Sequence, residues 1–156
     1  MQTIDIPNYK KLQIENIVFD YNGTLAEGGR INDTTKELLR RVCQLYNIYV
    51  ITADTFGTVA NELAGFDLEL VVLKSSDHAA EKRTLIEKIG KEHTVAIGNG
   101  NNDLQMLKAA ELSIAIISKE GCALPTLLAA DIAMNDISEV MKLFIDTKRL
   151  IATLRK

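Results

Sequence analysis

Six short runs of apolar, mostly β-branched residues recur along the chain, and segments with helical spacing lie between them. The runs lack the polar alternation of a half-exposed strand, which is typical of strands covered on both faces. Strands that alternate with helices over short connections predict a parallel sheet with helices on both of its faces. The predicted strands cover residues 17–19, 48–51, 68–73, 94–97, 114–117 and 132–134.

Amphipathic segments predict the helices. The clearest has Leu38, Leu39 and Val42 on one face and charged residues on the other. Gly65 and Gly90 are placed to end the second and third helices. The predicted helices cover about residues 34–46, 55–64, 79–89, 102–110, 122–130 and 137–154. The expected fold class is therefore α/β, a Rossmann-like sheet between two helical layers.

Length and composition predict one globular domain over residues 1–156, because no repeat, linker or change of composition divides the chain. With 47% hydrophobic and 25% charged residues, disordered and collagen-like classes are excluded. The net charge of −3, without a basic stripe, argues against a nucleic-acid partner and favours a small one. No run of about 18 apolar residues occurs, and residues 1–5 lack the pattern of a secretory signal. We therefore expect a cytoplasmic protein with no membrane partner.

Ligands of such sheets bind beyond the carboxyl ends of the strands, so the residues after each strand are the first candidates for a site. The first strand is followed by Asp20-Tyr-Asn-Gly-Thr-Leu25. The Asp20 carboxylate can act as a nucleophile or a cation ligand, while the turn at Gly23 and Thr24 exposes backbone N–H groups to an anion. A simple turn is the alternative for these residues.

The second strand ends in Thr52-Ala-Asp-Thr55, directly before a predicted helix. Hydroxyl groups beside the free N–H groups of a helix start can bind a phosphate, which makes Thr52, Ala53 and Asp54 candidate contacts. The alternative, which is the commoner use of such residues, is that Asp54 or Thr55 only caps the helix.

Two further segments add a lysine and a glycine-rich loop. Lys82, with Lys74 as its competitor, can neutralise a phosphoryl group or a carboxylate, and a solvated surface lysine is the alternative. The fourth strand leads into Gly98-Asn-Gly-Asn-Asn-Asp103, where Asp103 can face a divalent cation or serve only as a first-turn helix residue. Because the four segments occur in order at successive strand ends, we expect them to meet at one edge of the sheet.

Together these segments resemble the motifs of the haloacid dehalogenase superfamily of phosphohydrolases, which includes the phosphorylation domains of P-type ATPases. The segment that begins at Asp20 resembles the first motif, Asp-x-Asp/Thr-Gly-Thr, and Thr52 and Lys82 match the second and third. The loop that ends at Asp103 resembles the fourth, usually Gly-Asp-Gly-x-Asn-Asp. The resemblance covers about residues 16–134. Within the superfamily the three longer segments are most similar to the small soluble P-type ATPase-like proteins.

The resemblance implies a Mg²⁺-dependent phosphohydrolase or phosphotransferase that acts on a phosphorylated small molecule or a phosphoprotein. Asp20 would attack the phosphoryl group and form an aspartyl-phosphate, which water then hydrolyses. The implied catalytic residues are Asp20, Asn22, Thr52 and Lys82; the implied substrate contacts are Gly23, Thr24, Thr52, Ala53, Asp54 and Lys82; the implied Mg²⁺ ligands are Asp20, Asn22, Asn99 and Asp103.

Two positions depart from the family pattern. Asn22 stands where the phosphatases carry an acid/base Asp, and losing such a group typically slows turnover by about 10²–10⁴-fold. Asn99 stands where the family has a metal-binding Asp, which predicts weak Mg²⁺ binding that Asn99→Asp should tighten. These departures favour slow turnover or, as an alternative, a catalytically weakened fold that serves as a phospho-ligand-binding or protein-interaction module.

The short connection after the first motif leaves no room for the cap domain through which many of these enzymes select substrates. About eight residues from Ala26 to Asp33 separate the first-motif turn from its helix, enough for a short flap with Gly28 and Gly29. An uncapped site admits a large substrate or a neighbouring subunit that acts as a lid, so a homo-oligomer is one expectation.

Overall fold

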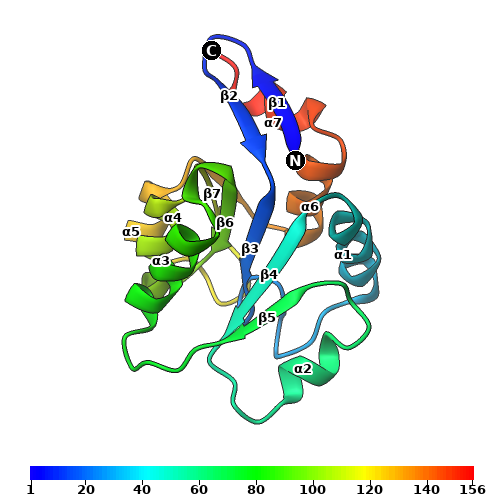
Figure 1. The fold of residues 1–156 in the computed structure, drawn as a ribbon, viewed down its shortest axis with the longest axis vertical. Coiled ribbons are helices and arrows are strands. Elements are labelled where there is room, and N and C mark those ends of the chain that lie inside the picture. Colours follow the sequence, from blue (N-terminus) through cyan, green and yellow to red (C-terminus); the bar gives the residue numbers. More distant parts are fainter.

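A six-stranded parallel sheet forms the centre of the computed structural model, which describes residues 1–156 (Figure 1). Its order is β5-β4-β3-β6-β7-β8, and every neighbouring pair is parallel. The predicted parallel sheet is confirmed, with the predicted strands in place. The strands are β3 (Asn16–Asp20), β4 (Asn47–Thr52), β5 (Glu69–Val72), β6 (Thr94–Gly98), β7 (Leu112–Ile116) and β8 (Ile132–Met134).

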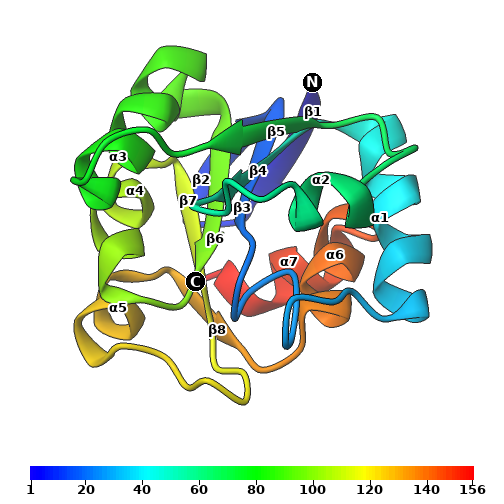
Figure 2. The ribbon, with the colours of Figure 1, turned by 90° about the horizontal axis from the view of Figure 1, so that it is seen from below.

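Helices cover both faces of the sheet, as expected for strands built on short continuous apolar runs (Figure 2). Helices α1 and α6 pack together on one face, while α3, α4 and α5 form the layer on the other. The helices are α1 (Asp33–Leu45), α2 (Thr58–Glu62), α3 (His78–Ile89), α4 (Leu104–Ala109), α5 (Leu124–Ala129), α6 (Ile137–Ile145) and α7 (Lys148–Leu154), with 3₁₀ turns at Lys91–His93 and Asn101–Asp103.

Two helical segments differ from their predicted extents. The segment predicted as one helix over 137–154 is two, because the chain turns extended at Asp146, the C-cap of α6, and resumes in α7. Helix α2 begins at Thr58, three residues after the predicted start, because residues 53–57 form a loop that is organised by the Asp54 carboxylate.

An antiparallel hairpin that the sequence analysis did not predict lies beyond the amino end of the sheet. It pairs β1 (Gln2–Ile6) with β2 (Lys10–Ile14). Its buried side chains, Ile4, Ile6, Leu12 and Ile14, alternate with exposed ones, the pattern of a sheet with one covered face. Helix α7 packs against β1, so both chain ends lie near this hairpin (Figure 1).

The strand order reverses between β3 and β6, because the chain adds β4 and β5 on one side of β3 and then returns to its other side. Such a switch point leaves a crevice at the carboxyl ends of the two strands. The connections beside it are short, residues 21–32 after β3 and 73–77 after β5, and neither holds an inserted cap domain. No helix combines the length and apolar character needed to cross a membrane.

Candidate active site

A polar cavity of about 260 Å³ lies at this switch point. Two larger cavities, of about 430 and 480 Å³, lie beside the flap and include neither Asp20 nor Lys82. The polar cavity therefore unites residues from four of the strand-end segments singled out in the sequence. Its lining is Asp20, Asn22, Thr52, Ala53, Leu73, His78, Lys82, Asn99, Gly100, Asn102 and Glu120.

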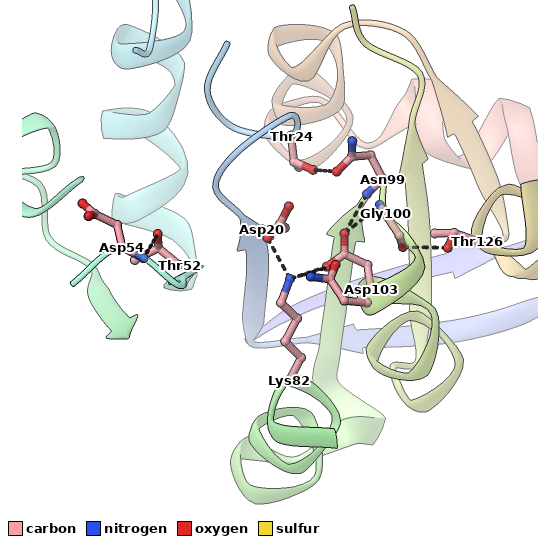
Figure 3. Close-up of polar contacts among 10 residues, drawn as sticks. Asp20, Thr24, Thr52, Asp54, Lys82, Asn99, Gly100, Asp103 and Thr126 are labelled. Carbon is pink, nitrogen blue, oxygen red and sulfur yellow. Dashed lines mark hydrogen bonds and ion pairs between the residues drawn. The ribbon is translucent and has the colours of Figure 1, made fainter. Parts of the chain in front are cut away.

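Lys82 projects from the first turns of α3 into the base of this cavity (Figure 3). Its side chain is only 2% exposed, and its ammonium lies 2.8 Å from Oδ1 of Asp20 and 2.7 Å from Oδ1 of Asp103. The surface-lysine alternative therefore does not describe Lys82. Its competitor Lys74 does not line the cavity and is exposed.

The charges of this cluster do not balance, because one ammonium serves two carboxylates. Burial and the nearby charge of Asp103 raise the pKa of Asp20 to about 6, against the opposing pull of Lys82. Burial acts to lower the pKa of Lys82, but the attraction of Asp20 and Asp103 outweighs it and the pKa is raised. Lys82 therefore stays charged, and the cluster carries a net charge of −1 once Asp20 ionises.

Asp103 is fully buried, and its carboxylate accepts three hydrogen bonds from protein groups. Oδ1 accepts from Lys82, and Oδ2 accepts from the backbone N–H groups of Asn99 and Gly100, each at 2.9 Å. Asp103 does not line the cavity. In this geometry it positions Lys82 and closes the glycine-rich loop, and its predicted role as a direct cation ligand stays a prediction.

The first-motif turn forms the opposite wall. Gly23 has a positive φ of 77°, the conformation that glycine adopts without strain, and Asn22 beside it is exposed. Thr24 is buried and donates its hydroxyl to Oδ1 of Asn99, at 3.3 Å (Figure 3). This bond joins the turn to the glycine-rich loop, but neither Gly23 nor Thr24 lines the cavity, and their expected substrate contacts stay predictions.

Thr52 and Asp54 have different roles at the end of β4. Thr52 is buried at the cavity wall, and its hydroxyl oxygen accepts the backbone N–H of Asp54, at 3.0 Å. Asp54 accepts the backbone N–H groups of Phe56 and Val59 and points away from Asp20 (Figure 3). The hydrogen bond from Thr58, followed by those from the two amides, lowers the pKa of Asp54. Asp54 therefore holds the loop before α2 and one N–H group of its first turn, although the N-cap itself is Gly57, and its expected substrate contact stays a prediction.

Three polar side chains of the cavity are not among the predicted site residues. Asn102 lies inside the fourth motif and its Oδ1 is 3.5 Å from the Lys82 ammonium, while His78 begins α3. Glu120 follows β7, the one central strand whose carboxyl end was not considered. Ligands of parallel sheets bind beyond the carboxyl ends of the strands, and this rule applies to β7 as it does to the other strands.

The donors around the cavity suit a hard cation. Asp20, Asn99 and Glu120 line it, and their side chains carry the oxygen atoms that Mg²⁺ prefers as ligands. No group of three or more His, Cys, Asp or Glu side chains able to hold a metal is present. A cation here would therefore combine carboxylate with amide or backbone oxygens, and the net charge of −1 on Asp20, Asp103 and Lys82 would attract it.

Comparison with known proteins agrees with this geometry. A model of the haloacid dehalogenase-like hydrolase family matches residues 77–120, which include Lys82 and the glycine-rich loop. An uncharacterized protein of Methanocaldococcus jannaschii is 41% identical over 78 residues, which cover 47% of this chain and 84% of that protein. The soluble P-type ATPase-like phosphatase of the same organism is 24% identical over 135 residues. That match covers 83% of this chain and 49% of the phosphatase, so the chain spans about half of that relative's length.

A similar fold occurs in 3-deoxy-D-manno-octulosonate 8-phosphate phosphatase from Moraxella catarrhalis, solved with a magnesium ion and a phosphate ion. The TM-score is 0.72, and the similarity covers 89% of this chain and 90% of that one. At 16% sequence identity this likeness establishes the fold alone.

Proposed function

Because this chain belongs to the haloacid dehalogenase-like hydrolases, we propose that it is a phosphatase or phosphotransferase whose nucleophile is Asp20. The observation that supports this most strongly is the Lys82 ammonium, buried between Asp20 and Asp103 at the wall of a polar cavity. Phosphoryl transfer depends mainly on positioning and charge neutralisation, which such a cluster supplies. The substrate class is a phosphorylated small molecule or a phosphoprotein.

The first step is attack of Asp20 on phosphorus. Lys82 binds Oδ1 of Asp20, which leaves Oδ2 to form the new P–O bond while the ester P–O bond breaks. The Thr52 oxygen accepts from the Asp54 amide, so its own proton is free to bond a phosphoryl oxygen. Asn22 cannot protonate the leaving oxygen, so that proton comes from water.

The second step is hydrolysis of the aspartyl-phosphate by water, which regenerates Asp20 and releases phosphate. The Asn22 amide cannot act as a base that takes a proton from that water, so we expect this step to be slow. A weakened fold that only binds phosphorylated ligands is the second candidate, because Asn22 and Asn99 both replace family carboxylates.

Asp20, the backbone carbonyl of Asn22 and the side chain of Asn99 would hold Mg²⁺. When bound, the ion would neutralise charge on the transferring phosphoryl group. The phosphatase from Moraxella catarrhalis, which shares this fold, was solved with a magnesium ion, and this supports the proposed use of Mg²⁺.

Hydrolysis of an aryl phosphate tests the proposal. We expect Mg²⁺-dependent release of the aryl alcohol by the wild-type protein and its loss in Asp20→Asn. Asp5→Asn is the matched control, since it makes the same change at an exposed position of the hairpin. Equal activity of Asp20→Asn and wild type would overturn the mechanism. A wild-type protein that hydrolyses no aryl phosphate but binds inorganic phosphate would favour the second candidate, the phospho-ligand-binding module.

A further inference from the structure

The loop after β7 places a carboxylate at the cavity, and this carboxylate belongs to none of the family motifs. Glu120 lines the cavity together with Asp20 and Asn99. Oε2 of Glu120 lies so close to Gly23 that a Cβ atom on residue 23 would overlap it. The same Cβ atom would lie 2.7 Å from Nδ2 of Asn99. The two side chains therefore share the space above the first-motif turn.

Three contacts fix this loop on the two motif segments. The Ser118 hydroxyl donates to the carbonyl of Gly23 at 2.9 Å. Nδ2 of Asn99 donates to the carbonyl of Gly121 at 3.3 Å, and the N–H of Ala123 donates to the carbonyl of Asn99 at 2.8 Å. Glu120 lies between these anchors, so its backbone is held at the cavity mouth although it belongs to a loop.

The Glu120 carboxylate has no partner of its own. It makes no hydrogen bond or ion pair with any side chain, while the adjacent Lys119 turns away toward Glu27, at 3.6 Å. Asp20, Asp103 and Lys82 together carry a net charge of −1, and Glu120 brings the charge at the cavity to −2. That is the charge that one divalent cation neutralises.

Asn99 fits this arrangement better than a carboxylate would. Its amide nitrogen points at the Gly121 carbonyl, whereas an Asp at this position would bring a charged oxygen toward that carbonyl and toward Glu120. The negative charge that the family carries at position 99 is therefore present instead on Glu120, in the loop after β7.

We propose that Glu120 supplies the second carboxylate of the divalent-cation site and so compensates for Asn99. The inference rests on the proposed function, because it assumes that a cation binds beside Asp20. It predicts stronger Mg²⁺ binding than the sequence departures imply, and it assigns to Glu120 a role as a cation ligand.

Calorimetric titration of the metal-free protein with Mg²⁺ tests the role without an activity readout. We expect Glu120→Gln to weaken binding by at least about tenfold, as loss of a group that supports a metal site typically does. Its melting temperature without Mg²⁺ should be unchanged, since the side chain has no protein partner. Glu92→Gln removes the same charge from an exposed site at the opposite end of the sheet and should leave the affinity unchanged.

The double variant Asn99→Asp/Glu120→Gln moves the charge to the family position and should recover most of the affinity lost in Glu120→Gln. If Glu120→Gln binds Mg²⁺ as tightly as wild type while Asp20→Asn binds none, the inference is overturned and the proposed function stands. If Asp20→Asn also keeps the wild-type affinity and the wild type hydrolyses no aryl phosphate, both are overturned.

Discussion

The ammonium of Lys82 lies 2.7 Å from Oδ1 of Asp103, a carboxylate with no exposed surface. Replacement of the lysine would leave that buried charge without its cation, which typically costs about 3–5 kcal/mol. We therefore expect Lys82→Met to lower the free energy of unfolding by about that amount, as measured by urea denaturation of the metal-free protein.

A second substitution separates charge from packing in this prediction. Asn at position 103 can still accept the backbone N–H groups of Asn99 and Gly100 through its amide oxygen while it removes the buried charge. Lys82→Met/Asp103→Asn should therefore be more stable than Lys82→Met alone. A double variant no more stable than the single one would show that the lost packing of the lysine stem dominates.

The raised pKa of Asp20 makes stability depend on pH. Its pKa is about 6 in the folded protein, against the ordinary value of 3.8 that we take for the unfolded chain, so the fold favours the protonated form. Ionisation of Asp20 therefore lowers the free energy of unfolding. This loss is absent below pH 3.8, develops as the pH rises to 6 and is complete above pH 6. The difference of about two pKa units corresponds to at most about 3 kcal/mol.

Asp20→Asn removes that loss and keeps an acceptor for Lys82. In metal-free protein we expect the variant to exceed the wild type in unfolding free energy at pH 8, with the gap closing as the pH falls toward 4. Denaturation curves of both proteins across this range measure the gap. A gap that is independent of pH would show that Asp20 titrates normally.

Gly98, the last residue of β6, is required by the side chain of Asp103. A Cβ at Gly98 would lie 2.5 Å from Cγ and 2.7 Å from Cβ of Asp103, which is fully buried and cannot retreat. Gly98→Ala should therefore destabilise the protein by about 1–3 kcal/mol, the usual cost of overpacking. Gly65→Ala is not a suitable control, because Gly65 has a positive φ of 86°. Ala133→Val on β8, where the side chain is exposed, tests the effect of added bulk in the same sheet.

The central sheet could be predicted because its inner strands β3, β6 and β7 are buried on both faces and so appear as continuous apolar runs. The hairpin was missed because its one covered face gives only alternation, with Ile4, Ile6, Leu12 and Ile14 spaced two apart within each strand. The break between α6 and α7 was missed because apolar residues continue past Asp146 in a helical pattern.

For the site, topology accounts for the predictable part. Asp20 and the loop after Gly98 follow adjacent strands, so their meeting follows from the strand order. The hydrogen bonds that Asp103 and Asp54 accept depend on backbone amides whose directions no spacing rule supplies. Glu120 reaches the cavity only because Ser118 and Gly121 dock on segments 95 and 22 residues away in the chain.

Asn22 makes the lifetime of the aspartyl-phosphate the most informative property of the proposed enzyme. An amide cannot accept the proton of the attacking water, whereas a positioned carboxylate typically accelerates such a step by about 10²–10⁴-fold. Asn22 is exposed at the cavity wall, so an Asp can occupy the position without repacking. We therefore expect Asn22→Asp to speed dephosphorylation within that range while it leaves stability nearly unchanged.

The measurement follows an acid-stable phosphoprotein after mixing with a radiolabelled phosphodonor and Mg²⁺. The wild type should accumulate label that Asp20→Asn does not, and Asn22→Asp should lose label faster while it releases phosphate faster. Asn61→Asp, the same change at an exposed position of α2, should behave as wild type. Because the amide at position 22 cannot accept the proton of the attacking water, equal decay rates for wild type and Asn22→Asp would place that proton transfer on another group of the cavity.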